Sequence, residues 1–297
     1  MNNVLGVDIG GTGIKSAIVS PSGEIKDKRY ITIKELAERG DLRKTITDYI
    51  CQRMAETEMT TVGIGIPGLL NRERNTPVEV TNIPAIEGIN FSDIIHDQQP
   101  HATVFLENDA ATAALAAAWF DPNRLSDSFV FITFGTGVGG ALVIEKALFG
   151  GPLGNAMEIS MMIESDAVIL EDRLGRDGIC ALVNQHLEQQ GDALRVAAPI
   201  EISHALKQGH PHIKEAMNKA ALRVANALHN LITLLDVRHF MIGGGVAPLF
   251  LAMEPTIRQR LDSTLTPYYR DYRFALSDLG NDAGLLGAAG LCFSKEE

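Results

Sequence analysis

The stretch Val4-Leu5-Gly6-Val7-Asp8-Ile9-Gly10-Gly11-Thr12 begins as an apolar run and ends in a glycine-rich turn. The same pattern returns at Val130-Phe131-Ile132-Thr133-Phe134-Gly135-Thr136-Gly137-Val138-Gly139-Gly140. Glycine reaches positive φ, and without a Cβ its N–H groups can approach an anion, so each turn can form a nest of donors. Either turn alone is equally well explained as a tight hairpin. Two such turns, each directly after an apolar strand, predict a nucleotide-binding protein.

Strand-like and helix-like segments alternate along the chain, which predicts an α/β architecture. The expected strands are residues 4–7, 14–19, 61–66, 102–106, 130–133, 141–144 and 240–242, and the expected helices are residues 42–56, 110–119 and 217–235. Both halves begin with a strand, a glycine turn and a strand, so we expect two domains that face a cleft. A polar segment with a proline, residues 121–127, is the predicted boundary between them.

Composition excludes several classes of protein. The chain has 297 residues, 45% of them apolar, and a formal net charge of −11, without a run of Lys and Arg. Nucleic acid is therefore not an expected partner. The sequence shows neither a basic and apolar leader nor about 18 consecutive apolar residues, so we expect a cytoplasmic protein that does not enter a membrane.

The cysteines do not form a motif. Cys51, Cys180 and Cys292 are isolated from one another and odd in number. This spacing argues against a disulfide framework and against a cysteine-rich zinc site. We expect three small buried thiols.

Asp109 is the candidate for acid–base chemistry. It follows the strand that ends at Leu106 and precedes an alanine-rich helix, where the helix dipole favours an ionised carboxylate. Asn108 or Asp109 at this place is also explained as a helix cap. The functional interpretation is a general base that accepts the proton of a substrate hydroxyl during phosphoryl transfer.

Five motifs together resemble the ROK family of sugar kinases and repressors, in the right order and over nearly the whole chain. They are Leu5-Gly6-Val7-Asp8-Ile9-Gly10-Gly11-Thr12 with Ile14-Lys15, Glu107-Asn108-Asp109-Ala110, Gly135-Thr136-Gly137-Val138-Gly139-Gly140, Ile242-Gly243-Gly244-Gly245-Val246 and Leu285-Leu286-Gly287-Ala288-Ala289. The resemblance implies a two-lobed, actin-like ATPase (ribonuclease H-like) fold with a cleft. We expect an N-terminal lobe of residues 1–120, completed by a helix at 284–297, and a C-terminal lobe of residues 121–283.

The resemblance also implies roles for individual residues. ATP phosphates would bind at Asp8, Gly10, Gly11, Thr12, Lys15, Gly135, Thr136 and Gly137, and the adenosine at Gly243, Gly244 and Gly245. Sugar hydroxyls would bind at Asn108, Asp109, Glu158 and Glu171, with Asp109 as the base. Asp8 would hold Mg²⁺, directly or through water.

One segment departs from the family pattern. Where the family has E-x-G-H, this chain has Glu158-Ile159-Ser160-Met161, and the cysteines of the family's zinc loop are missing. A thioether does not replace an imidazole on Zn²⁺, so we expect no zinc site. Glu158 and Glu171 match the family's sugar-binding glutamates, although each is also explained as a surface carboxylate.

Histidine is the residue type most able to replace a missing zinc ligand. His210 and His212 form an H-x-H pair beside Pro211, but no third ligand is apparent in the sequence, so we expect a solvated loop. The apolar run at residues 161–163 is expected to contribute to packing.

The leading functional hypothesis is an ATP- and Mg²⁺-dependent kinase that phosphorylates a hydroxyl, expected to be the 6-hydroxyl, of a hexose or N-acylhexosamine. Alternatives are a sugar-responsive repressor, a sugar-binding protein with little kinase activity, and a kinase that uses polyphosphate. The repressor is disfavoured because the first strand begins at Val4, which leaves no DNA-binding domain before it. The sequence does not determine which sugar is used, and it leaves the family's common homodimer open because the zinc loop is missing.

Overall fold

Two compact units make up the chain. The structure, a computed structural model, describes residues 2–165 and 167–294. The first unit consists of Met1–Pro122, Ala141–Ala156 and Asn281–Glu297, and the second of Asn123–Gly140 and Met157–Gly280. The expected C-terminal lobe includes residues 141–156, whereas the structure places Ala141–Ala156 in the first unit. Residues 295–297 of the expected terminal helix lie outside the described residues.

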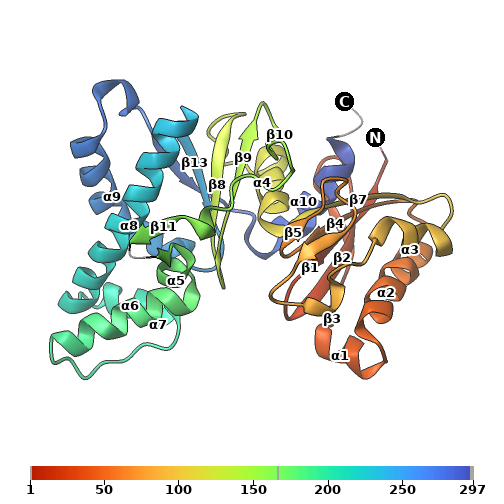
Figure 1. Ribbon diagram of the computed structural model, residues 1–297, viewed down its shortest axis with the longest axis horizontal. Coiled ribbons are helices and arrows are strands. Elements are labelled where there is room, and N and C mark those ends of the chain that lie inside the picture. Colours follow the sequence, from red (N-terminus) through yellow and green to blue (C-terminus); the bar gives the residue numbers. More distant parts are fainter. Residues whose placement is uncertain (1, 166, 295–297) are drawn as a thin grey trace. The chain divides into compact units, whose positions relative to one another are not determined.

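The first unit is built on a five-stranded sheet with the order β3-β2-β1-β4-β7 (Figure 1). Its strands are β1 (Val4–Ile9), β2 (Gly13–Val19), β3 (Ile25–Thr32), β4 (Thr61–Ile66) and β7 (Thr103–Asn108). β1 pairs antiparallel with β2 and parallel with β4, and β4 pairs parallel with β7. Three carboxyl ends therefore lie at one edge of the sheet.

The two faces of this sheet are covered by different helices. The helices of this unit are α1 (Ile33–Glu38), α2 (Leu42–Thr57), α3 (Phe91–Gln98), α4 (Asp109–Phe120) and α10 (Ala283–Phe293). Leu5 and Ile64 face a buried apolar cluster to which α2 and α3 contribute. Gly6 and Gly63 face α10 instead, because a Cβ on either would meet a backbone carbonyl of that helix. Figure 1 shows α10, from the end of the chain, beside α4.

β3 was not among the expected strands. It pairs antiparallel with β2 at the edge of the sheet, and the five residues Lys26–Tyr30 are all exposed. Charged edge strands resist pairing with other chains, and they lack the apolar alternation by which strands are recognised.

The second unit contains most of a second sheet, with the order β10-β9-β8-β13-β14. The strands are β8 (Phe129–Phe134), β9 (Val138–Ile144), β10 (Ala147–Leu148), β13 (His239–Gly243) and β14 (Arg273–Leu276). β13 is parallel to both β8 and β14. The chain passes from the second unit into the first within β9, after Gly140.

In its described residues, the second unit contains five α-helices. They are α5 (Glu171–Leu174), α6 (Arg176–Gln189), α7 (Pro199–Lys207), α8 (Pro211–Leu235) and α9 (Phe250–Thr264). α8 begins six residues before the expected Met217, because Pro211 starts the helix at its first position. His210 and His212 are therefore the N-cap and second residue of a helix, and the expected solvated loop is wrong.

Short elements complete the fold. They are β5 (Leu69–Leu70), β6 (Pro77–Glu79), β11 (Ile163–Ser165), β12 (Val168–Ile169) and the 3₁₀ turns η1 (Pro84–Ile86), η2 (Ile159–Met161), η3 (Ala247–Leu249), η4 (Pro267–Tyr269) and η5 (Gly280–Asp282). All three cysteines are buried, as expected. Among the described residues, no helix has the length and apolarity needed to cross a bilayer.

Candidate functional site

The first glycine turn is a tight hairpin between β1 and β2. Gly10 donates to the carbonyl of Gly13 at 2.9 Å, and Gly13 donates back at 3.2 Å. Gly11 and Thr12 form the exposed tip, and in the described part of the chain their N–H groups have no acceptor. The hairpin interpretation is therefore correct for the backbone, and the same geometry presents two donors at the tip.

Asp8 is the second-to-last residue of β1, two positions before Gly10 of this hairpin. Its Oδ2 is 3.1 Å from Nζ of Lys15, which also donates to the carbonyl of Asn281 at 3.0 Å. The start of α10 approaches the same carboxylate, since a Cβ on Gly284 would lie 2.7 Å from its Cγ. A lysine ammonium and a helix N-terminus therefore both lie beside this carboxylate.

Asn108 is the last residue of β7 and Asp109 follows it, two strands away from β1 on the same sheet. Asn108 caps α4, because its Oδ1 accepts from the N–H groups of Ala110 at 2.9 Å and Ala111 at 3.2 Å. Its Nδ2 donates to the carbonyl of Gly68 at 3.1 Å. Asp109 is the exposed first residue of the helix. Of the two residues that could have been the cap, Asn108 has this role.

The register places these residues at one edge of the sheet. Asp8 is paired in register with Gly65, and Gly65 with Glu107. With neighbouring strands 4.7–4.9 Å apart, the backbones of Asp8 and Glu107 are about 10 Å apart. Asp8 and the Asn108-Asp109 pair therefore lie at the same end of the first unit's sheet, on either side of β4.

The second glycine turn is fixed by α5 and α6. Gly135 donates to the carbonyl of Gly137 at 2.9 Å, and the N–H of Arg176 donates to the carbonyls of Gly135 and Thr136. Among the residues that the structure describes, none comes within 4 Å of a Cβ placed on Gly135, and Thr136 is exposed. The turn is anchored on one side and open on the other.

Glu171 contacts this turn. Its Oε2 accepts from the N–H of Val138 at 2.9 Å. A Cβ on Gly137 would lie 2.0 Å from the same oxygen, so only glycine permits this contact without moving Glu171. Glu171, expected at the sugar, is thus held in this structure beside the second turn.

The third glycine motif lies beside the second. Gly244 has φ +88°, and a Cβ there would lie 2.2 Å from the carbonyl oxygen of Phe134, to which Val246 donates at 2.9 Å. The motif follows β13, and the second turn follows the adjacent parallel strand β8. Open α/β sheets bind their ligands at such carboxyl ends of parallel strands.

Glu158 and its neighbours lie in the segment that departs from the family pattern. Glu158 is exposed at the start of η2, and Ser160 Oγ donates to its Oε2 at 3.5 Å. Met161 is 62% exposed and Ile163 is 74% exposed. The expected packing role of residues 161–163 is therefore wrong for these two side chains.

The structure groups the expected residues by unit. The first unit holds Asp8, Gly10, Gly11, Thr12, Lys15, Asn108 and Asp109, and the second holds Gly135, Thr136, Gly137, Glu158, Glu171, Gly243, Gly244 and Gly245. Arg74 forms an ion pair with Glu107, the residue before Asn108, and donates to Asn155 Oδ1 at 2.9 Å. The sequence did not indicate these contacts, because Arg74 lies in an irregular loop. Asn155 in turn donates to the carbonyl of Leu70 at 2.7 Å, which ties residues 141–156 to the first unit.

These turns and carboxylates can be compared with known proteins. The model of the ROK family matches residues 4–295. The chain belongs to the ROK family. A glucokinase of Halalkalibacterium halodurans is 27% identical over 98% of this chain and 95% of its own length. An N-acetylmannosamine kinase of Pasteurella multocida is 27% identical over 96% of this chain and 94% of its own length. By reaction class, this ROK protein is a carbohydrate kinase.

Solved structures agree with this assignment. A crystal structure from Cytophaga hutchinsonii superimposes with a TM-score of 0.91 and 27% identity, over 98% of this chain and 100% of that one. A ROK family glucokinase from Streptomyces griseus, in complex with glucose and AMPPNP, has the same fold at 24% identity and a TM-score of 0.77, over 98% and 99% of the two chains. The expected fold class, α/β of the actin-like ATPase type, is confirmed.

Proposed function

We propose that this ROK protein transfers the γ-phosphoryl group of ATP to the 6-hydroxyl of a hexose or N-acylhexosamine in the cytoplasm, with Asp109 as general base. The observation that carries this proposal is the placement of Asn108 and Asp109 at the start of α4. Asn108 caps the helix through two backbone N–H groups, and Asp109, whose Oδ1 accepts from the N–H of Ala110 at 2.8 Å, stands exposed at the helix N-terminus. A base at this place can accept the hydroxyl proton as the hydroxyl oxygen attacks phosphorus.

The sugar would be held by side chains with several acceptor positions. The second hydrogen of Asn108 Nδ2 and the carboxylate of Asp109 lie at the edge of the first unit. On the second unit, Glu158 and Glu171 are exposed carboxylates that can accept from vicinal hydroxyls. Glu171 would accept from the sugar with Oε1, because Oε2 accepts from the N–H of Val138. One side chain would then contact both the sugar and the second glycine turn.

The residues of the glycine turns fit a nucleotide. The N–H groups of Gly11 and Thr12 at the hairpin tip, and the open space beside Gly135, suit phosphate oxygens. The turn at Gly243–Gly245, beside β8, suits the adenosine. When bound, Mg²⁺ would neutralise phosphate charge, and the Asp8 carboxylate is the hard oxygen ligand that it prefers.

A coupled ADP-release assay tests this proposal. Full-length protein would be supplied with ATP and Mg²⁺ and with glucose, mannose, fructose, allose, N-acetylglucosamine or N-acetylmannosamine, each sugar also being tested with polyphosphate as donor. We expect strong turnover with ATP on one sugar or a small group of sugars, and phosphorylation at carbon 6 by NMR of the product.

Two results would favour the alternatives. Turnover with polyphosphate but not with ATP would change the donor. A sugar that raises the melting temperature without any turnover would identify a sugar-binding protein, which is the alternative motivated by Ser160 and Met161 in the departing segment.

A further inference from the structure

Three possible metal ligands converge at the start of α8 in the second unit. His212 and Glu215 lie on the first turns of α8, and His186 lies on α6. His186 Nε2 is 3.1 Å and His212 Nδ1 is 3.5 Å from Oε2 of Glu215, and the three ligand atoms all lie within 4.8 Å of one another. The sequence did not indicate this group, because 26 positions separate the two histidines and α8 was expected to begin only at Met217.

The spacing of these atoms suits a small divalent cation. Zinc binds imidazole nitrogen at 2.0–2.1 Å, so neighbouring ligands of a tetrahedral site are about 3.4 Å apart. The two measured separations, 3.1 and 3.5 Å, bracket this value. The three side chains differ in exposure: 5% of the His186 side chain is exposed, 32% of that of His212 and 56% of that of Glu215. One ligand is therefore fixed in the core, and the other two border on solvent.

We propose that His186, His212 and Glu215 form a binding site for Zn²⁺ or a similar imidazole-preferring divalent cation, with a fourth position open to water. Two imidazoles and one carboxylate are a donor set typical of zinc, and not of Mg²⁺ or Ca²⁺, which prefer oxygen ligands alone. The site would connect α6 to α8. It is distinct from the cysteine loop that this chain lacks, and it is independent of the proposed kinase reaction.

Lys219 opposes metal binding in a way that can be tested. Its Nζ is 3.0 Å from His186 Nδ1. An ammonium can only donate, so Nδ1 is the acceptor and the proton of the neutral ring is on Nε2, directed at Glu215. A metal on Nε2 requires that proton to move to Nδ1 and the ammonium to turn away. Lys219 is exposed, so it can turn into solvent.

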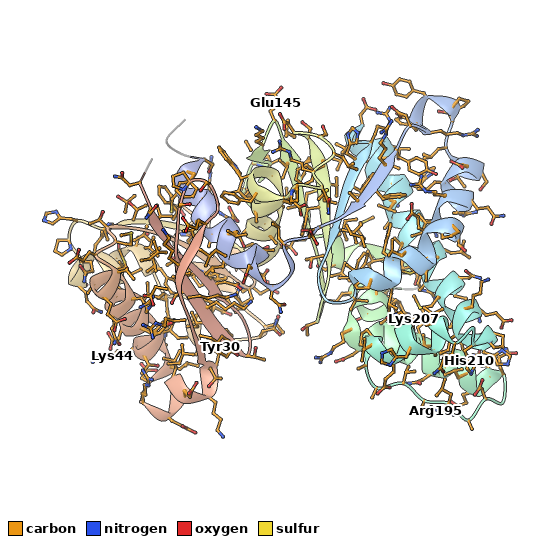
Figure 2. The ribbon with its side chains drawn as sticks, turned by 180° about the vertical axis from the view of Figure 1, so that it is seen from behind. Tyr30, Lys44, Glu145, Arg195, Lys207 and His210 are labelled. Atoms are coloured by element: carbon orange, nitrogen blue, oxygen red, sulfur yellow. The ribbon has the colours of Figure 1, made fainter. Side chains whose placement is uncertain are left out.

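The neighbouring histidine extends the cluster without completing it. His210, labelled at one end of the second unit in Figure 2, has its ring 6.1 Å from that of His212. Its Nε2 is 3.3 Å from Oδ2 of Asp192, and its buried Nδ1 has no hydrogen-bond partner in the described part of the chain, but neither nitrogen belongs to the group of ligand atoms that lie within 4.8 Å of one another. The open position is therefore assigned to water.

The test is zinc binding by the full-length protein after treatment with a chelator. Titration against a chromophoric chelator at neutral pH should show one equivalent of Zn²⁺, and thermal unfolding should shift upward with Zn²⁺ but not with Mg²⁺. His212→Gln and Glu215→Gln should each weaken binding by about tenfold or more, since loss of even an outer partner typically costs that much. His229→Gln, on the same helix about 25 Å along its axis, is the matched control and should bind normally.

Lys219→Met separates metal binding from a plain histidine–carboxylate contact. Removal of the ammonium should tighten Zn²⁺ binding several-fold. The proposal is overturned if the wild type binds no Zn²⁺ at about 100 µM, if His212→Gln and Glu215→Gln bind as well as the control, or if Lys219→Met leaves the binding constant unchanged.

Discussion

Substitution of Gly63 by alanine should selectively destabilise the first unit. Gly63 is in β4, and a Cβ there would lie 1.7 Å from the carbonyl oxygen of Ala288 in α10 and 3.1 Å from Sγ of Cys292. Ordinary contact begins at about 3.4 Å, so the backbone of α10 would have to retreat by about 1.7 Å. A backbone carbonyl cannot turn aside as a flexible side chain can.

The expected cost follows from this overlap. Inserting a methyl group into a packed core typically costs about 1–3 kcal/mol, and contact with a helix backbone belongs at the upper end. Alanine recovers about 0.4–1 kcal/mol by restricting the unfolded chain. A net loss of about 2 kcal/mol, with a urea dependence of about 2 kcal/mol per molar, lowers the unfolding midpoint by about 1 M.

The assay uses the chain's single tryptophan. Trp119 lies in α4, in the first unit, so its fluorescence during urea unfolding reports on that unit. Gly10→Ala is the matched control in the same unit, because the nearest atom to a Cβ there is the carbonyl oxygen of Gly13 at 3.6 Å, which is ordinary contact. If Gly63→Ala and Gly10→Ala unfold at the same urea concentration, the close packing of α10 on the first sheet is refuted.

Three further perturbations test the site residues and the core. Asn108→Ala removes the cap of α4 and should cost about 1 kcal/mol in the Trp119 unfolding assay, together with weaker sugar binding by calorimetry; unchanged stability would contradict the capping role. Lys15→Met removes the partner of Asp8 and should raise KM for MgATP several-fold with little change in KM for the sugar, as steady-state kinetics would show; the reverse pattern would exclude a role at the nucleotide. Burial raises the pKa of the Cys51 thiol to about 11, and the nearby charge of Asp48 makes a smaller contribution in the same direction. Because the pKa is higher in the folded state, the stability that this thiol contributes is complete below its unfolded pKa and is lost as the pH rises toward 11. Native Cys51 should accordingly resist iodoacetamide at about pH 8.5, and rapid labelling measured by mass spectrometry would show that the thiol is not buried.

Local sequence signals predicted the elements that carry the glycine turns. Apolar runs followed by glycines became β1, β8 and β13, because a buried parallel strand and a breaker are both visible in a few residues. Asn108 and Asp109 were likewise placed correctly at the start of a helix. These features depend on neighbours in the sequence and require little knowledge of tertiary packing.

Other features depend on long-range contacts and were not predictable in this way. Residues 141–156 belong to the first unit partly because Asn155 bonds to Leu70, 85 positions away. Glu171 bonds to the second glycine turn across 33 positions. β3 was not predicted because its charged residues lack the apolar alternation of a half-buried strand. The start of α8 at Pro211 was not predicted because the expected helix was defined by the apolar periodicity that begins at Met217.

The central claim is that Asp109 acts as the base in sugar phosphorylation, and comparison of Asp109→Asn with the wild type tests it most directly. We would measure kcat by ADP release and the sugar Kd by calorimetry on the same preparations. Because Asn108 retains the cap of α4, the variant should remain folded and bind sugar within a few-fold of the wild type. The account predicts that kcat falls by about 10²–10⁴. A kcat within tenfold of the wild type, or a loss of sugar binding equal to the loss of turnover, would contradict it.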